Sequence, residues 1–255
     1  MKVIAIMGSP HKGRGFEIVQ KIEAELCRFD DIEFSYVFLK DANLELCQGC
    51  FACIGKGEQF CPLKDDKNSI EAEILSADGV ILSTPGYAMN VSAMMKNFID
   101  RFAHSLHRPK FFNQSLMLVA NGGSGLSKVN SSLGMTLGGS NKVSELKITT
   151  TPWQATEEYE KRVQKDIEKA ADRLYRSMQN KKLASPSLGN LIWFRIFKKM
   201  SSLSEQNLPA DYEYYRIKTD YFYPTRVNPI KNRVAGIIAN IGVATMKKQV
   251  KFNDL

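Results

Sequence analysis

The sequence has no apolar run long enough to cross a membrane. Its first apolar stretch spans only Val3 to Met7 and runs directly into Gly8-Ser9-Pro10, whereas a signal peptide or a spanning helix needs a longer run. We therefore expect no export and no membrane span, and we expect the protein to be cytoplasmic. With 255 residues and 44% apolar side chains, the chain can bury a substantial core.

The sequence also lacks a nucleic-acid-binding motif, an internal repeat and a low-complexity tract. Lys and Arg number 35 against 27 Asp and Glu, for a net charge of +8, which would suit a polyanionic partner. However, the basic residues are interleaved with acidic ones except in the last quarter of the chain, as on an ordinary solvated surface. We expect no nucleic-acid partner and a local pocket for an anionic cofactor.

Histidine is scarce, and none lies between His11 and His104, the interval that contains the cysteine-rich stretch CQGCFACIGKGEQFC, residues 47–61. Its spacing, C-x2-C-x2-C-x7-C, allows an iron-sulfur cluster, a zinc site, free thiols or disulfides. Disulfides are the weakest of these in a reducing cytosol, and zinc sites usually pair two separated C-x2-C knuckles. Cys27 lies outside this stretch, in a predicted helix, and is expected to be a small buried residue.

Five short apolar stretches have the character of buried strands, and amphipathic stretches with helical spacing separate them. This alternation predicts an α/β fold with a doubly wound parallel sheet, in which ligands bind beyond the carboxyl ends of the strands. The ligand loops are then 8–16, 84–91 and 120–126. The predicted strands are 2–8, 32–39, 77–85, 115–123 and 142–149, and the predicted helices are 16–28, 68–76, 91–104, 126–137 and 155–180.

The stretch GSPHKGRGFEIV follows the first predicted strand and opens a helix. Backbone N–H groups at the helix start, the Ser9 hydroxyl and the cations of Lys12 and Arg14 suit a phosphate monoester. Because the loop lacks both G-x-G-x-x-G and G-K-[ST], a mononucleotide fits better than a dinucleotide or a P-loop ligand. The alternative is a tight turn that needs glycine only for its backbone.

The stretch STPGYAMNVSAMMKNFIDRF leaves the third strand through Pro85-Gly86, turns at Tyr87 to Asn90, and enters an amphipathic helix that Asn90 could cap. An aromatic side chain and exposed backbone amides at a sheet edge suit a flat heteroaromatic ring. Tyr87 and the amides of residues 88–90 are the candidates. The alternative is an ordinary loop with a packed tyrosine.

Four stretches in this order, GSPHKGRGF, CQGCFACIGKGEQFCPLKDD, ADGVILSTPGYAMNVSAMMKNFIDRF and ANGGSG, resemble the NAD(P)H-dependent FMN reductase group of flavodoxin-like proteins. Within that group they are most similar to the iron-sulfur flavoproteins. The resemblance covers roughly residues 1–180 and implies a flavodoxin-like five-stranded sheet, FMN as cofactor and NAD(P)H as electron donor. It also implies a homodimer or homotetramer in which a neighbouring subunit helps to cover the flavin. Carried over by position, the cofactor-binding residues are Ser9, His11, Lys12, Arg14, Gly15, Phe16, Pro85, Gly86, Tyr87, Ala88, Met89, Asn90, Asn121, Gly122, Gly123 and Gly125.

The cysteine spacing resembles the compact motif of the iron-sulfur flavoproteins, which implies a 4Fe-4S cluster held by Cys47, Cys50, Cys53 and Cys61. Cluster-free reductases of the same group also keep cysteines in this loop, so free thiols stay an alternative. One position departs from the family pattern. Members usually have a Ser or Thr hydroxyl for the phosphate where this chain has Phe16, so backbone amides or Arg14 must replace it.

We predict two domains: a flavodoxin-like FMN-binding domain over residues 1–184, with the cysteine-rich insertion at 47–61, and a mostly helical C-terminal extension over 185–255. The extension contains two cationic amphipathic segments separated by an aromatic stretch. We expect these segments to pack on the protein itself or on a partner subunit, as a lid or an oligomer contact, rather than on a membrane surface.

The resemblance implies an FMN-dependent oxidoreductase. It would pass electrons from NAD(P)H or another donor to a small-molecule or protein acceptor, such as a quinone, a flavin, oxygen or an electron carrier. The flavin carries the chemistry, so no side chain is expected as an obligatory acid or base, although His11 and Tyr87 are expected near the ring. The alternative is a non-catalytic flavin-binding electron-transfer or redox-sensing protein, whose thiols report oxidation.

Overall fold

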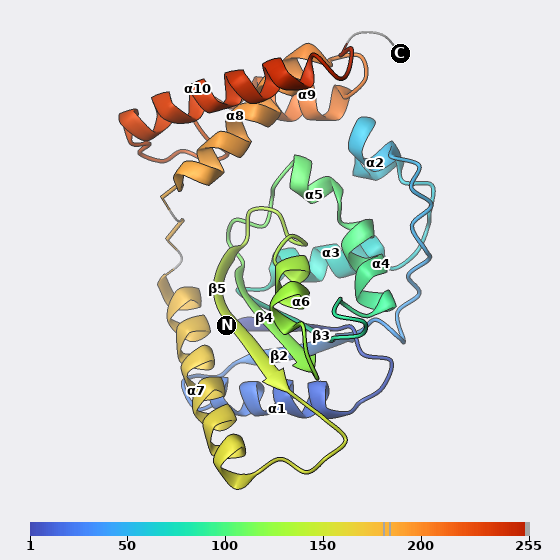
Figure 1. Cartoon of the computed structure of the whole chain (residues 1–255), viewed down its shortest axis with the longest axis vertical. Coiled ribbons are helices and arrows are strands. Elements are labelled where there is room, and N and C mark those ends of the chain that lie inside the picture. Colours follow the sequence, from blue (N-terminus) through green and yellow to red (C-terminus); the bar gives the residue numbers. More distant parts are fainter. Residues whose placement is uncertain (181, 184, 253–255) are drawn as a thin grey trace. The chain divides into compact units, whose positions relative to one another are not determined.

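A computed structural model describes residues 1–180, 182–183 and 185–252. The chain divides into two compact units (Figure 1). The first unit comprises residues 1–47, 63–106 and 110–182, and the second comprises 48–62, 107–109 and 183–255. Most of the cysteine-rich segment therefore groups with the C-terminal helices. The predicted domain boundary at residue 184 lies outside the described residues.

The first unit is built on a parallel sheet of five strands in the order β2-β1-β3-β4-β5. The chain moves outward from β1 in one direction, returns, and continues from β3 in the other, so the strand order reverses between β1 and β3. This is the flavodoxin-like doubly wound fold that the sequence predicts. The strands are β1 (Lys2–Met7), β2 (Glu33–Phe38), β3 (Gly79–Pro85), β4 (Ser115–Gly122) and β5 (Asn141–Thr149).

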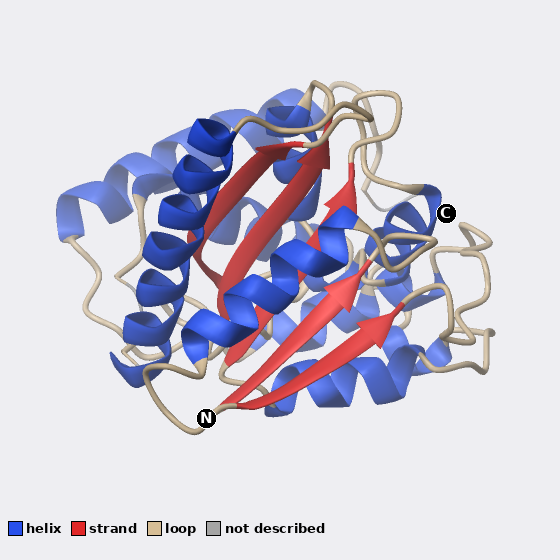
Figure 2. Cartoon of the chain, turned by 90° about the horizontal axis from the view of Figure 1, so that it is seen from below, coloured by secondary structure: helices blue, strands red, loops and turns tan. Residues whose placement is uncertain are grey.

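Helices cover both faces of this sheet (Figure 2). Ile4 and Ile6 of β1 pack with α3, α4 and α6, whereas Val3, Ala5 and Met7 pack with α1 and α7. Because both faces are buried, the central strands are apolar at nearly every position, as the sequence pattern indicates. The helices of this unit are α1 (Arg14–Leu26), α3 (Lys67–Ser76), α4 (Ala93–Arg101), α6 (Leu126–Leu133) and α7 (Glu157–Asn180), and α5 (His104–His107) begins in this unit and ends in the second.

Two details differ from the sequence predictions. Helix α4 begins after Ser92, whose Oγ accepts a hydrogen bond from the backbone N–H of Met95 at 3.2 Å, so the cap is Ser92 and not Asn90. Cys27 is exposed rather than buried. Helix α1 ends at Leu26, so Cys27 lies just beyond the buried stripe of that helix.

The second unit is mostly helical and has an aromatic core. Phe194 and Tyr215 are buried in it, and the Phe194 and Phe222 rings meet edge to face with centroids 5.0 Å apart. Among the described residues, no helix is long and apolar enough to span a membrane. The elements of this unit are α2 (Ala52–Gly55), the short 3-10 helix η1 (Glu58–Phe60), α8 (Leu188–Leu203), α9 (Pro209–Arg216) and α10 (Pro229–Met246).

A buried ion pair closes the base of the long connection between β2 and α3. The side chains of Arg101 and Asp65 are only 2% and 1% exposed, and Arg101 Nη2 lies 2.9 Å from Asp65 Oδ1. Asp65 also accepts backbone hydrogen bonds from Glu45 at 2.8 Å and Lys67 at 3.1 Å. Burial raises the pKa of Asp65, but these hydrogen bonds and the Arg101 charge outweigh it and hold that pKa below its ordinary value.

We expect the substitution Asp65→Asn to lower the free energy of unfolding by about 3 to 5 kcal/mol, because it leaves the Arg101 guanidinium buried without a counter-ion. Urea denaturation followed by circular dichroism measures the change. The matched control is Asp100→Asn, which breaks an exposed ion pair with Lys96 on the same helix and should cost less than about 1 kcal/mol. Equally small losses in both variants would show that the hydrogen bond from Arg101 to the carbonyl of Glu45 is enough to stabilise the buried guanidinium.

Candidate functional site

Three loops meet at the carboxyl edge of the sheet, where the strand order reverses. The loops follow β1, β3 and β4, whose parallel pairing brings their ends to one edge. The backbone N–H of Gly8 donates to the carbonyl of Ser83 at 2.8 Å, and that of Gly86 donates to the carbonyl of Asn121 at 2.7 Å. The structure thus brings the three predicted ligand loops together.

The first loop folds around Ser9. Its hydroxyl donates to the carbonyl of His11 at 2.7 Å and accepts from the His11 N–H at 3.3 Å. The cations of this loop lie at its surface: Lys12 Nζ sits 4.5 Å from the centre of the Phe38 ring, and Arg14 Nη1 lies 3.1 Å from an oxygen of Glu17. Helix α1 begins here without a side-chain cap, so its first turn leaves N–H groups for an anion.

Phe16, at the position where the family resemblance implies a hydroxyl residue, is turned toward β2. Its ring packs edge to face with Tyr36 and with Phe38, each at 5.4 Å between centroids. The side chain therefore contributes packing between α1 and β2 and offers no hydrogen-bond donor to a phosphate.

The second loop forms a strained two-residue turn after Pro85, the last residue of β3. Tyr87 and Asn90 exchange backbone hydrogen bonds of 2.9 Å in both directions. Between them, Ala88 and Met89 adopt left-handed φ angles of 48° and 60°, which cost non-glycine residues about 1 to 3 kcal/mol each and cluster at ligand sites. The Tyr87 side chain is 48% exposed, so it is not the packed tyrosine of an ordinary loop.

The third loop places a buried hydrogen-bond acceptor where the three loops meet. Asn121 is 7% exposed, and its Oδ1 accepts no hydrogen bond from the described residues, while its Nδ2 donates to Thr150 Oγ1 at 3.3 Å. A Cβ atom on Gly15 would lie 2.8 Å from that Oδ1, so the start of α1 reaches it closely. A buried acceptor without a donor is costly, and a ligand hydroxyl or N–H group would satisfy it.

Glycines allow the second and third loops to touch. Gly122 has a φ of 151°, and a Cβ atom there would meet the carbonyl of Gly86 at 3.2 Å. Gly125 precedes α6 with a φ of 72°, and a Cβ atom there would come within 2.8 Å of the Met89 side chain. Gly123 is exposed beside them. Side chains at the first two positions would push the loops apart.

Ser92 joins the first two loops, and the sequence analysis missed it. Its Oγ donates to the carbonyl of Gly8, its N–H donates to Thr84 Oγ1 at 3.2 Å, and the residue is 2% exposed. Asn90, the predicted cap, instead accepts a hydrogen bond from the next N–H, that of Val91, at 2.8 Å. Serine directly before the helical pattern AMMKNF was an equally good cap signal.

The site where the three loops meet has polar and aromatic groups that fit a flavin mononucleotide. The uncapped start of α1 suits a phosphate, the exposed aromatic and fixed turn of the second loop suit a flat ring, and the orphaned Asn121 oxygen suits a ligand donor. The three predicted groups of residues, in loops 8–16, 85–90 and 121–125, therefore lie where one such ligand could contact all of them.

The predicted cluster ligands are not gathered in the same way. Cys47 and Cys50 are exposed, and Cys53 and Cys61 are partly buried. Among the described residues, no group of three or more Cys, His, Asp or Glu side chains is placed to hold a metal ion. As the segment lies, its thiols do not fit a cluster or a zinc ion. Phe51 has a left-handed φ of 56° directly before the single turn of α2.

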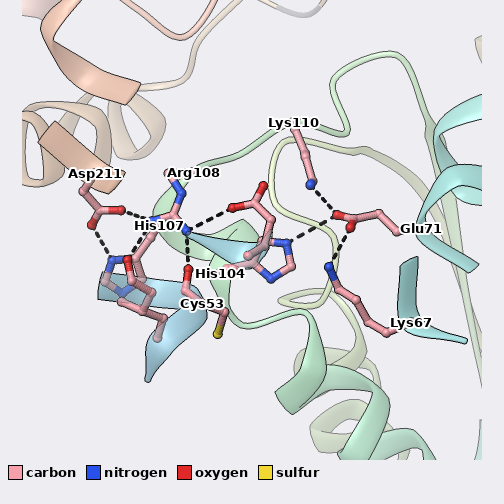
Figure 3. A network of polar contacts seen from close by, with 10 residues as sticks. Cys53, Lys67, Glu71, His104, His107, Arg108, Lys110 and Asp211 are labelled. Atoms are coloured by element: carbon pink, nitrogen blue, oxygen red, sulfur yellow. Dashed lines mark hydrogen bonds and ion pairs between the residues drawn. The ribbon is translucent and has the colours of Figure 1, made fainter. Parts of the chain in front are cut away.

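A buried arginine in the second unit holds the middle of the cysteine segment (Figure 3). Arg108 donates to the carbonyl of Ile54 at 2.9 Å and also to the carbonyl of Cys53, at the end of α2. Its counter-ion is Asp211 of α9, which is 2% exposed and also lies 2.8 Å from His107 Nδ1. A cation at a helix carboxyl end is favourable, and this one connects α2 to α9. The sequence carries no signal for the pair beyond two basic residues before Pro109.

A second polar network, also drawn in Figure 3, lies in the first unit and joins α3, α5 and the residues that follow α5. Lys67 Nζ is 2.6 Å from one oxygen of the buried Glu71, while Lys110 and His104 Nε2 contact the other, the latter at 3.3 Å. Burial raises the pKa of Glu71, but the hydrogen bonds from His104, Lys110 and Lys67 outweigh it and hold that pKa far below its ordinary value. We assign this cluster a structural role because its carboxylate is fully engaged.

Comparison with known proteins identifies the family. The model of the NADPH-dependent FMN reductase family matches residues 1–146. An iron-sulfur flavoprotein of Archaeoglobus fulgidus is 36% identical over 110 residues, which cover 43% of this chain and 49% of the relative. An iron-sulfur flavoprotein of Methanosarcina thermophila is 33% identical over 101 residues, or 40% and 52% of the two chains. The chain thus spans about half the length of the curated relatives it matches.

Solved structures show the same fold at low sequence identity. An FMN-dependent NADH-azoreductase from Bacillus anthracis in complex with FMN has a TM-score of 0.52 and 12% identity, covering 69% of this chain and 100% of that one. The structure of RosB with a bound intermediate has a TM-score of 0.52 and 13% identity, covering 90% and 92%. Since the family model matches more than half of its length, the chain belongs to the NADPH-dependent FMN reductase family.

Proposed function

We propose that this chain is an FMN-dependent oxidoreductase with its flavin at the junction of the three loops. It would pass electrons from NAD(P)H or another donor to a quinone, a flavin, oxygen or an electron carrier. The observation that carries this proposal is the buried, unsatisfied Asn121 Oδ1 at the carboxyl edge of the sheet, beside an uncapped helix start. Bound FMN would supply the electron-accepting ring, and the protein supplies its position and shielding.

Each loop has a distinct proposed task. The first-turn N–H groups of α1 bind the phosphate, and Lys12 adds charge at the rim. Arg14 contributes less than a buried cation would, because it is exposed and paired with Glu17. The turn at Ala88 and Met89 fixes backbone N–H groups against the ring rim, and Asn121 accepts a hydrogen bond from the ligand. No side chain is assigned as an acid or base, and His11 and Tyr87 remain the neighbours to test.

The 4Fe-4S cluster at Cys47, Cys50, Cys53 and Cys61 is a proposal supported by the thiol spacing and by the names of the relatives. Because the described segment does not gather three ligands, cluster binding requires these thiols to come together.

A non-catalytic, redox-sensing flavoprotein is the second candidate, favoured by the exposure of Cys47 and Cys50. Steady-state oxidation of NADH or NADPH separates the two, since a sensor shows no turnover. The homodimer or homotetramer, and the role of residues 185–255 as lid or oligomer contact, stay predictions.

The purified protein should release FMN, and not FAD, on denaturation, because the first loop offers a site for one phosphate and lacks the dinucleotide fingerprint. Chromatography of the released chromophore identifies it. Release of FAD, or failure of the colourless protein to bind added FMN, would contradict the proposed site.

The substitution Asn121→Ala should raise the FMN dissociation constant by about tenfold, the effect of one hydrogen bond of about 1 to 1.5 kcal/mol. The unfolding free energy of the flavin-free protein should fall only by the contribution of the 3.3 Å hydrogen bond from Nδ2 to Thr150 Oγ1, since Oδ1 has no donor among the described residues to lose. Flavin fluorescence titration and urea denaturation measure the two quantities.

The matched control for this prediction is Asn130→Ala. Asn130 also has a buried, unsatisfied Oδ1, and its Nδ2 donates to the carbonyl of Leu146 at 3.2 Å, between α6 and β5. Its loss should lower stability and leave the FMN dissociation constant unchanged. Equal effects of both substitutions on FMN binding would show that Asn121 acts only through the fold.

Anaerobic purification followed by iron, sulfide and zinc analysis tests the cysteine segment. With a cluster, iron and sulfide should be stoichiometric, and Cys61→Ser should reduce both while FMN stays bound. Cys27→Ser is the control, because Cys27 directly follows α1 and lies outside the segment. If the wild-type protein contains FMN but no iron, sulfide or zinc, the four cysteines of the segment are free thiols.

A further inference from the structure

Helix α10 has two different apolar faces. One is formed by small residues, Ala235, Ala239 and Val243, and is buried. The other consists of Ile230, Val234, Ile237, Ile238 and Ile241, which recur at helical spacing. We call this second set the isoleucine face. Ile230, Ile237 and Ile241 are 74%, 61% and 62% exposed.

The described residues of the second unit, to which α10 belongs, do not cover the isoleucine face. Small residues let α10 pack closely on α8, where a Cβ atom on Gly242 would lie 3.8 Å from the Ile196 side chain. The buried face of α10 thus packs within the C-terminal extension. Five large aliphatic side chains on one exposed stripe form a patch of the kind that marks an interaction surface.

The charges around this face all have one sign. Residues 221–252 contain six basic side chains, Arg226, Lys231, Arg233, Lys247, Lys248 and Lys251, and no Asp or Glu. At 100° per residue, Lys231 and Arg233 fall on opposite borders of the isoleucine face. Lys247 and Lys248 follow the last turn of the helix. The apolar stripe of α10 is therefore bordered by the cations of its own segment.

We propose that the isoleucine face of α10 docks on an anionic membrane surface, with the helix lying in the plane of the interface. An exposed apolar stripe flanked by Lys and Arg matches the interfacial class of amphipathic helix, which inserts its apolar side at the level of the headgroups. The flanking cations then meet anionic lipid headgroups. The helix lies on the surface and does not span it, in keeping with its amphipathic character.

A second copy of this chain is a poorer partner for the same face. In a twofold-symmetric contact the same patch occurs on both sides, so the Lys and Arg borders of one α10 would meet those of the other. Since residues 221–252 contain no acidic side chain, nothing within the patch would pair with them. The homodimer or homotetramer expected from the family resemblance would then use a different surface.

Flotation of the full-length protein with lipid vesicles tests this docking. We expect binding to vesicles of phosphatidylcholine mixed with phosphatidylglycerol, little binding to phosphatidylcholine alone, and weaker binding at high salt. The double substitution Ile237→Ser with Ile241→Ser should lower the partition coefficient by about tenfold or more, because it removes apolar area that the membrane would bury. The pair Lys247→Gln with Lys248→Gln should lower it by roughly tenfold on anionic vesicles.

Met135→Ser is the control, because it removes an apolar side chain of similar exposure, 58%, in the first unit, and should leave vesicle binding unchanged. Far-UV circular dichroism confirms that each variant is folded. The proposal is overturned if the wild-type protein does not float with anionic vesicles, or if the double isoleucine variant binds them equally well. Light scattering that shows an oligomer in the wild type, dissociated by the same double substitution without any vesicle binding, assigns the face to a second copy instead.

Discussion

The buried ion pair between Arg101 and Asp65 anchors the connection between β2 and α3 to helix α4 of the first unit. Arg101 ends α4, and Asp65 lies just before α3 and holds the backbone of Glu45, so the pair fixes the base of the cysteine segment to a helix of the sheet. At its other end, α4 begins after Ser92, whose hydroxyl donates a hydrogen bond to the carbonyl of Gly8 in the first loop. One short helix therefore connects the flavin-site loops to the base of the thiol-bearing segment.

Three buried carboxylates of the fold each pair with one or more cations. Asp65 faces Arg101, Glu71 faces Lys67 and Lys110, and Asp211 faces Arg108. An unpaired buried charge is severely destabilising, whereas a paired one specifies which segments meet. In this chain the arginines also reach backbone carbonyls, so they order segments that have no strand or long helix of their own.

The sequence predicted the sheet because its strands are apolar on both faces, and it located the ligand loops because glycine and proline end those strands. It placed Asn121 and the turn at residues 87–90 correctly at the sheet edge but chose Asn90 as the cap, since Asn and Ser have equal cap propensity. The prediction that Cys27 is buried was wrong, because α1 ends one residue earlier, at Leu26, and Cys27 is exposed. The pairing of Arg108 with Asp211 joins residues 103 positions apart, and no local pattern in a single sequence encodes such a contact.

That long separation has a consequence for how the protein is made. Translation proceeds at about 5 to 20 residues per second, so Asp211 is synthesised roughly 5 to 20 s after Arg108. Until then the guanidinium that holds the carbonyls of Cys53 and Ile54 has no Asp211 to anchor it. The pairing of Arg108 with Asp211 therefore forms only after all five strands of the sheet, the last of which ends at Thr149, have been synthesised.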